Sequence, residues 1–245
     1  MKEKIKLKQI LLLILIMMSI RVSAQDSAIS DKLLENCKKE LEEISEKKVE
    51  IHDIVFNSDG HWLILYGDIG FSYSYLPTEL ENLILDLNKK GTNINKAIML
   101  NDTTWSVVYG AKSYTSKSLP EYANKDFETI LKKEKPIKAI DIENENQRIT
   151  LFGNNGFIAK GLPNKMIEKL SELNKKQVTL REVTLHNDGW VLLYGKHGIA
   201  FQNLPSDLTE KLKKFGKNKT KVNLVRFYKD KWIVVYNDAK VLTNF

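Results

Sequence analysis

Trp62-Leu-Ile-Leu-Tyr-Gly67 and Trp190-Val-Leu-Leu-Tyr-Gly195 are two copies of one six-residue motif. Trp105–Gly110 and Trp232–Asn237 are two further copies, and Arg148–Gly153 fits the same pattern. The first residues of the five copies stand at positions 62, 105, 148, 190 and 232, so the copies follow one another at intervals of 42 or 43 residues. A fixed period of this length is the sequence signature of a repeat protein, and the spacing predicts five structural units.

The residues around each motif predict three strands per unit. Before the motif, each copy carries two apolar residues at alternating positions, which indicates a strand with one buried face. We assign these pairs as Ile54/Phe56, Ile98/Leu100, Ile140/Ile142, Val183/Leu185 and Val225/Phe227. The motif itself is almost continuously apolar, which favours a central strand covered on both faces. A tight turn between glycines, such as Gly67–Gly70, then leads into a weaker third strand.

A helix precedes the three strands of each unit. Four of the five prolines follow a leucine just before an amphipathic segment. Proline loses no hydrogen bond in the first turn of a helix, so these prolines predict helix starts. They are Pro77, Pro120, Pro163 and Pro205. We therefore expect a single α+β repeat domain over residues 25–245, whose units span about 25 to the 70s, 77–118, 120–161, 163–203 and 205–245.

Neighbouring units must share a core, because about 43 residues cannot bury one alone. They can do so in a closed ring or in an open array whose end units carry polar caps. The first and last copies are as apolar as the middle ones, so no cap is visible. This favours a closed, five-bladed α/β ring similar to a propeller, with the open array as the alternative.

The N-terminal segment has the features of a signal peptide. Four lysines precede the apolar run from Ile10 to Ile20, which is too short to cross a bilayer comfortably. Small residues at Val22-Ser23-Ala24 predict cleavage between Ala24 and Gln25, and an uncleaved anchor is the alternative. Cleavage would lower the net charge from +7 to about +3, so we expect no nucleic-acid partner and no membrane span in the mature protein.

The sequence offers few catalytic or metal-binding patterns. The only cysteine, Cys37, shares a helical face with Leu33, Leu41 and Ile44 and is expected to be a buried apolar residue. The four histidines show no metal-ligand spacing and there is no serine-hydrolase elbow, so we predict no metal, no cofactor and no catalytic residue. Asn and Asp are frequent in the turns before the motif strands. They are expected to form turns; gathered on one rim, they would also suit calcium or sugar hydroxyls.

The first position of the motif provides the candidate binding residues. It holds Trp62, Trp105, Trp190 and Trp232, with Arg148 in the third copy. The tryptophans are expected to pack between units, and a shared binding rim is the alternative. Arg148 marks where one unit departs from the packing pattern, because a guanidinium is rarely buried unpaired. The aromatic four residues later is expected to be a repeated packing residue; it is Tyr66, Tyr109, Phe152, Tyr194 and Tyr236 in the five copies.

The repeat resembles propeller-type proteins, and more narrowly bacterial exported proteins with tandem Trp-(apolar)3-Tyr-Gly units, over residues 48–245. This resemblance implies a fold and no activity. The set of five helix-bearing units also resembles the α/β propeller of the deiminase group. Those enzymes need a catalytic cysteine late in the chain, whereas Cys37 is early, so their activity does not carry over.

Repetition without a catalytic cluster favours an exported, non-catalytic binding protein whose ligand is a protein or a glycan. The expected location is the periplasm, the cell surface or the medium. An enzyme acting on cell-wall or other polysaccharide is the first alternative, and a structural envelope component is the second. The sequence leaves the ligand and the oligomeric state open.

The first prediction concerns export. N-terminal sequencing of the protein purified from its native cell should begin at Gln25, because the small residues before it suit a signal peptidase. A membrane-associated protein that still begins at Met1 would contradict this assignment.

Overall fold

The computed structural model describes residues 30–245, so the predicted signal peptide and the cleavage site at Ala24 and Gln25 lie outside the described residues. Within this part, the predicted repeat is confirmed: five units each contain one helix followed by a three-stranded antiparallel sheet. The first unit comprises a helix over residues 30–46, β1 (Ile51–Phe56), β2 (Trp62–Tyr66) and β3 (Gly70–Tyr73).

The remaining four units repeat this order. The second unit comprises α2 (Thr78–Lys89), β4 (Ile94–Asn101), β5 (Thr104–Tyr109) and β6 (Ser113–Lys117). The third comprises α3 (Glu121–Lys132), β7 (Ile137–Asn144), β8 (Gln147–Phe152) and β9 (Gly156–Lys160). The fourth comprises α4 (Asn164–Lys175), β10 (Leu180–His186), β11 (Gly189–Tyr194) and β12 (Gly198–Gln202). The fifth comprises α5 (Ser206–Lys217), β13 (Val222–Tyr228), β14 (Lys231–Tyr236) and β15 (Lys240–Thr243).

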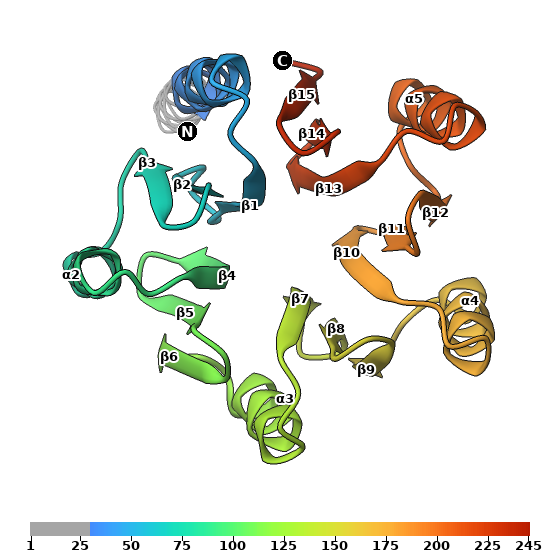
Figure 1. Cartoon of the computed structure of the whole chain (residues 1–245), viewed down its shortest axis with the longest axis horizontal. Helices are drawn as coiled ribbons and strands as arrows, with labels where there is room; N and C mark the ends of the chain where they lie inside the picture. The colour runs from blue at the N-terminus through green and yellow to red at the C-terminus, as the bar shows by residue number, and fades with distance from the viewer. Residues whose placement is uncertain (1–29) are drawn as a thin grey trace, which may run out of the picture.

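Each sheet is an open meander with the motif strand in the middle, as predicted. The units are arranged around a common centre, with the first strand of each unit nearest to it and the helices on the outside (Figure 1). The first strands contact one another in sequence order, and β13 also contacts β1. No described helix is long and apolar enough to cross a membrane.

The hydrophobic cores lie between neighbouring sheets. One core joins Ala139 and Ile149 of the third unit to Leu170 and Val183 of the fourth. Another joins the two ends of the chain, and it is made by Cys37, Leu41, Ile44, Ile54, Leu224, Ile233 and Val235 among others. The first helix and β15 accordingly lie side by side (Figure 1). Each sheet is therefore covered by a neighbouring unit as well as by a helix.

The prolines stand one position earlier than predicted. Each is the N-cap residue, with φ between −57° and −49° and ψ between 139° and 143°, so its backbone is still extended. The carbonyl of Pro77 accepts the Glu81 N–H at 2.9 Å, which begins the helical ladder. Proline fits this position because an N-cap residue donates no helical hydrogen bond.

One pair of the first-strand assignment was wrong. The register places Ala97 and Met99, not Ile98 and Leu100, at the positions equivalent to Ile54 and Phe56. Both faces of this part of β4 are apolar, so an alternating pattern could not distinguish them.

The aromatic residue at the fifth position of the motif packs over the following hairpin. A Cβ placed on Gly198 would lie 2.3 Å from Tyr194 Cε2 and 2.6 Å from the Tyr194 carbonyl oxygen, so only glycine fits. Gly195 has a φ of +52°, and the fifth copy uses Asn237, a residue that tolerates this region, at φ +48°. The packing role predicted for the aromatic is confirmed, although the Tyr194 ring is only half-buried.

We expect Gly198→Ala to lower the free energy of unfolding by about 1–3 kcal/mol, because the methyl group forces the Tyr194 ring and backbone apart. Gly216→Ala in α5 is the matched control, since no atom lies within 4 Å of its added Cβ and alanine favours helix. Urea denaturation should show opposite shifts for the two variants. Equal shifts would contradict the packing argument.

Candidate functional site

The repeat is broken on one face of the first strands. The face that packs on the preceding unit is apolar in all five copies. The opposite face carries a different residue in each copy at two successive levels. From the first to the fifth unit these residues are Asp53, Lys96, Ala139, Glu182 and Leu224; then Val55, Ile98, Asp141, Thr184 and Arg226. A third set, next to the turns, lines one cavity and also differs between copies: Asn57, Leu100, Glu143, His186 and Tyr228. Packing alone does not require such variety.

Four of these side chains form the central charge cluster: Asp53, Lys96, Glu182 and Arg226. The Lys96 ammonium lies 2.7 Å from Glu182 Oε2 and 3.4 Å from Asp53 Oδ1. The Arg226 Nη2 lies 2.6 Å from Asp53 Oδ1 and 3.2 Å from Glu182 Oε1. The four side chains are between 1% and 13% exposed, and they tie together β1, β4, β10 and β13.

Backbone groups complete the cluster. The Asp53 carboxylate accepts the N–H groups of Ile54 and Ala97, and Arg226 Nε donates to the Ile54 carbonyl at 3.0 Å. Burial opposes ionisation of Asp53, but the charges of Lys96 and Arg226 hold its pKa below the ordinary value. Burial alone would lower the pKa of Arg226, but the carboxylates of Glu182 and Asp53 raise it. These shifts favour the charged forms of Asp53 and Arg226, and the polar groups of the cluster are largely satisfied.

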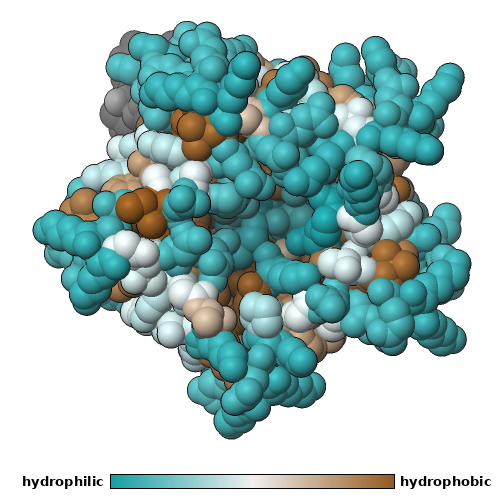
Figure 2. All heavy atoms as spheres, viewed as in Figure 1, coloured by the Kyte–Doolittle hydropathy of each residue, from teal (hydrophilic) through white to brown (hydrophobic). Residues whose placement is uncertain are grey.

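The cluster separates two cavities at the centre of the molecule. The turn-side cavity, of about 580 Å³, is lined by residues 54–58 and by the equivalent ends of the other first strands, and Arg226 reaches it. The second cavity, of about 490 Å³, is called the bulge-side cavity because each first strand has a β-bulge near its start. It is lined by the starts of the first strands, and Lys96 and Glu182 reach it. Figure 2 shows that the centre of one face is hollowed and bordered mainly by hydrophilic residues.

Two carboxyl groups on β7 line the turn-side cavity. Burial raises the pKa of Asp141 to about 7, although its carboxylate accepts the Leu185 N–H at 2.9 Å. Burial also raises the pKa of Glu143, while a hydrogen bond from the Asn187 backbone opposes this shift. Asp141 is partly buried and Glu143 is exposed, and both line the turn-side cavity. The cavity therefore contains a pair of carboxyl groups that take up protons more readily than usual.

Aromatic rings line the same cavity. His186 stacks on Phe227 with ring centroids 4.1 Å apart and an interplanar angle of 2°, and Phe56 stacks on Tyr228 at 5.5 Å. Burial lowers the pKa of His186, which favours the neutral imidazole. A concave surface of this kind, apolar with a few polar groups, suits a small ligand.

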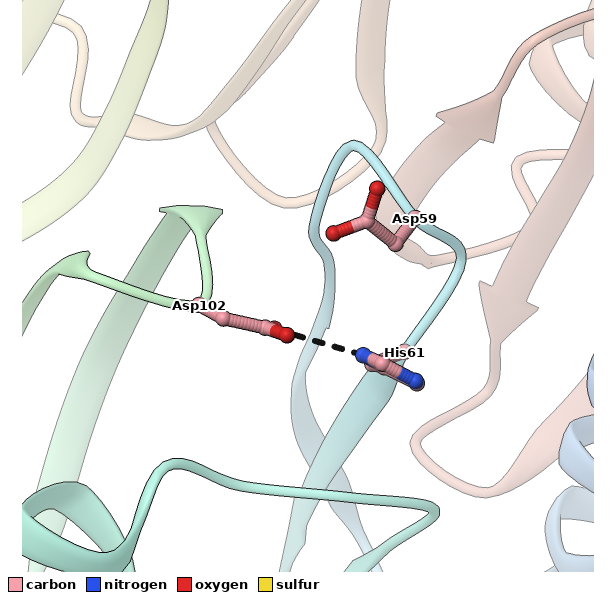
Figure 3. Close-up of side chains that lie close together, drawn as sticks. All are labelled: Asp59, His61 and Asp102. Atoms are coloured by element: carbon pink, nitrogen blue, oxygen red, sulfur yellow. Dashed lines mark hydrogen bonds and ion pairs between the residues drawn. The ribbon is translucent and has the colours of Figure 1, made fainter.

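Three side chains at the rim have the ligand types of a metal site. Asp59 and His61 come from the turn between β1 and β2, and Asp102 comes from the turn between β4 and β5 (Figure 3). Their possible ligand atoms lie within 4.8 Å of one another, and His61 Nδ1 is 3.3 Å from Asp102 Oδ1. An imidazole with two carboxylates suits a divalent cation such as Zn²⁺. The sequence spacing did not indicate this group, because its members belong to two units.

Three asparagines of these turns serve the turns themselves, which supports the expectation that they are turn residues. The Asn57 side-chain oxygen accepts the N–H groups of Asp59 and His61. Asn101 and Asn144 accept the N–H group two residues later in their own turns. These are Asx turns.

The four tryptophans are buried, each between 2% and 4% exposed. Each packs in a core that its unit shares with a neighbouring unit, as expected from the sequence. Trp62 Nε1 donates to the Leu33 carbonyl at 2.9 Å, and Trp232 Nε1 donates to Asp207 at 3.0 Å. Within residues 30–245, Trp105 Nε1 and Trp190 Nε1 have no hydrogen-bond partner. Rings buried to this extent offer a ligand little surface, so the binding role of Trp62, Trp105, Trp190 and Trp232 stays an untested prediction.

Arg148 makes the contacts of a structural ion pair. Its Nε lies 2.7 Å from Asp126 Oδ2, its Nη1 donates to the Glu145 carbonyl, and its guanidinium carbon lies 4.6 Å from the centroid of Tyr122. Arg148 and Asp126 are 12% and 13% exposed. Tyr122 lines the turn-side cavity, so Arg148 supports a residue of the cavity wall.

Neither a protein-family model nor a curated protein sequence matches this chain. The function must therefore follow from the chemistry of the cavities themselves.

We expect Arg148→Ala to lower the free energy of unfolding by about 1–3 kcal/mol, because it leaves the Asp126 carboxylate without its partner. Lys125→Ala is the control, since the ion pair of Lys125 with Glu121 is exposed and contributes little. The measurement is urea denaturation. An unchanged stability in Arg148→Ala would restore Arg148 as a candidate ligand contact.

Proposed function

We propose that this protein is an exported, non-catalytic binding protein whose five units close into a ring and hold a glycan in the turn-side cavity. The observation that carries the proposal is the cavity itself, which is lined by all five first strands at positions where the repeat is broken. Repeated residues provide the scaffold, and unique residues provide the recognition surface.

Ring closure is supported by the contacts between the two ends of the chain. The first helix shares a core with β13 and β14, β13 contacts β1, and Arg226 reaches across to Asp53. In an open array these surfaces would be solvent-exposed at opposite ends. A ring keeps the turn-side cavity at a fixed size, because its wall comes from elements held on both sides.

The choice of a glycan over a protein rests on concavity and chemistry. A cavity of about 580 Å³ accommodates a small ligand, whereas protein partners usually require a broad, flatter surface. The carboxyl groups of Asp141 and Glu143 accept hydrogen bonds from hydroxyl groups, and the rings of Phe227 and Tyr228 offer apolar faces. Export is supported by the N-terminal segment, since extracellular glycans are then available as ligands.

An enzyme acting on polysaccharide is the second candidate, and one observation favours it. Asp141 and Glu143 line one cavity, and burial raises both of their pKa values. Glycoside hydrolysis uses two carboxyl groups, one of which must hold a proton near neutral pH. Titration with an oligosaccharide separates the two candidates when the release of product is measured as well.

The test is a screen of the mature protein against an array of neutral oligosaccharides, followed by calorimetric titration with the best binder. We expect Glu143→Gln to weaken binding about tenfold or more, because the carboxylate loses charge-assisted hydrogen bonds to hydroxyl groups. Asp188→Asn is the matched control: Asp188 is exposed in a neighbouring turn and does not line the cavity.

The absence of binding to any oligosaccharide would contradict the proposal, as would equal loss of affinity in both variants. Release of reducing sugar by the wild-type protein, abolished in Glu143→Gln, would establish the enzyme instead.

A further inference from the structure

Every first strand contains a β-bulge at the same place, at the end opposite to the turns. The register shifts between residues 51 and 53 of β1 and at the equivalent point of the other four first strands. The five bulge residues are His52, Asn95, Lys138, Arg181 and Asn223, and all five line the bulge-side cavity. A bulge redirects a side chain, and here all five side chains carry nitrogen.

Three of the bulge residues hold the hairpin of their own unit. His52 Nε2 contacts the Gly67 carbonyl, and Asn95 Nδ2 donates to the Gly110 carbonyl at 2.6 Å. Asn223 accepts the Asp238 N–H at 3.0 Å and donates to its carboxylate at 2.8 Å. The ordinary role of this position is therefore to tie the first strand to the second hairpin of the unit.

Lys138 and Arg181 depart from this role. Arg181 Nη1 donates to the Val222 carbonyl of the next unit at 2.8 Å, and its Nε and Nη2 are buried without a partner within residues 30–245. Burial lowers the pKa of Arg181 and, with no neighbouring charge involved, that of Lys138. The two residues are equivalent positions of β7 and β10, which contact each other. An unpaired buried donor is costly, so the two unpaired nitrogens of Arg181 point to a missing partner, and Lys138, which is only partly buried, lies on the neighbouring strand.

The other charged groups near this cavity do not supply that partner. Glu182 is held by Lys96 and Arg226 in the central charge cluster. Asp238 is held by Lys221 and Asn223. Glu50 lines the cavity but is exposed to solvent.

We propose that the bulge-side cavity is an oxyanion-binding site in which Arg181 and Lys138 hold a carboxylate or phosphate group of a small ligand. A guanidinium can bind two oxygen atoms of one such group at once, and an ammonium adds a third contact. This site is separate from the turn-side cavity, because the central charge cluster lies between them.

The test is calorimetric titration of the mature protein with inorganic phosphate and with glucuronate, using glucose as the uncharged counterpart of glucuronate. We expect one saturable site for an oxyanion, and affinity that falls as salt concentration rises. Preference for phosphate or for glucuronate identifies which oxyanion the site takes. Arg181→Gln and Lys138→Gln should each weaken binding about tenfold or more. Arg181→Lys keeps the positive charge but loses the paired N–H donors of the guanidinium, so its affinity should lie between those of the wild-type protein and Arg181→Gln.

Lys229→Gln is the matched control, because it removes one positive charge at the turn-side cavity. Its oxyanion affinity should equal that of the wild-type protein. Near-ultraviolet circular dichroism establishes that each variant is folded. If Arg181→Gln does not fold, the loss of oxyanion affinity in Lys138→Gln provides the test. The proposal is overturned if neither oxyanion binds the wild-type protein, if glucose displaces bound phosphate, or if Lys229→Gln weakens binding as much as the other variants. The phosphate titration is independent of neutral glycan binding by the turn-side cavity, because phosphate is not a sugar.

Discussion

A three-stranded sheet has two faces, and the single helix of its unit cannot cover both. The structure meets this constraint by placing each hydrophobic core between two successive sheets, with a helix at the outer edge. The first and last units are subject to the same constraint, and they satisfy it against each other through Cys37, Leu41, Leu224 and Ile233. Stability is therefore shared among units, and no unit is expected to be stable when isolated.

The same arrangement brings the first strands together at the centre, where no helix or further sheet of residues 30–245 covers them. Asp53, Lys96, Glu182 and Arg226 fill this space as a buried ion network. Burying four charges is costly, and well-packed apolar side chains often give equal or greater stability. The network instead fixes which strands meet, because each carboxylate contacts both cations, and it leaves a polar floor for the cavity on either side.

The residues that recur in every unit and the residues that line the proposed sites stand at different positions of the unit. The tryptophans, the hairpin glycines and the helix-capping prolines recur in equivalent places and hold the scaffold. The central ends of the first strands differ from unit to unit, and so do the bulge residues. Both proposed sites depend on this difference: the glycan site on Asp141 and Glu143, and the oxyanion site on Lys138 and Arg181.

The sequence by itself determined the number of units, their order of elements and the central place of the motif strand, because these follow from local periodicity. Only the tertiary structure decided which polar residues meet. Asp53 and Arg226 are 173 residues apart, and Lys96 and Glu182 are 86 apart, so no local pattern pairs them. The bulges were equally hidden, because one extra residue shifts an alternating pattern without breaking it. Both cavities form where five distant strands converge, and that convergence depends on packing between units.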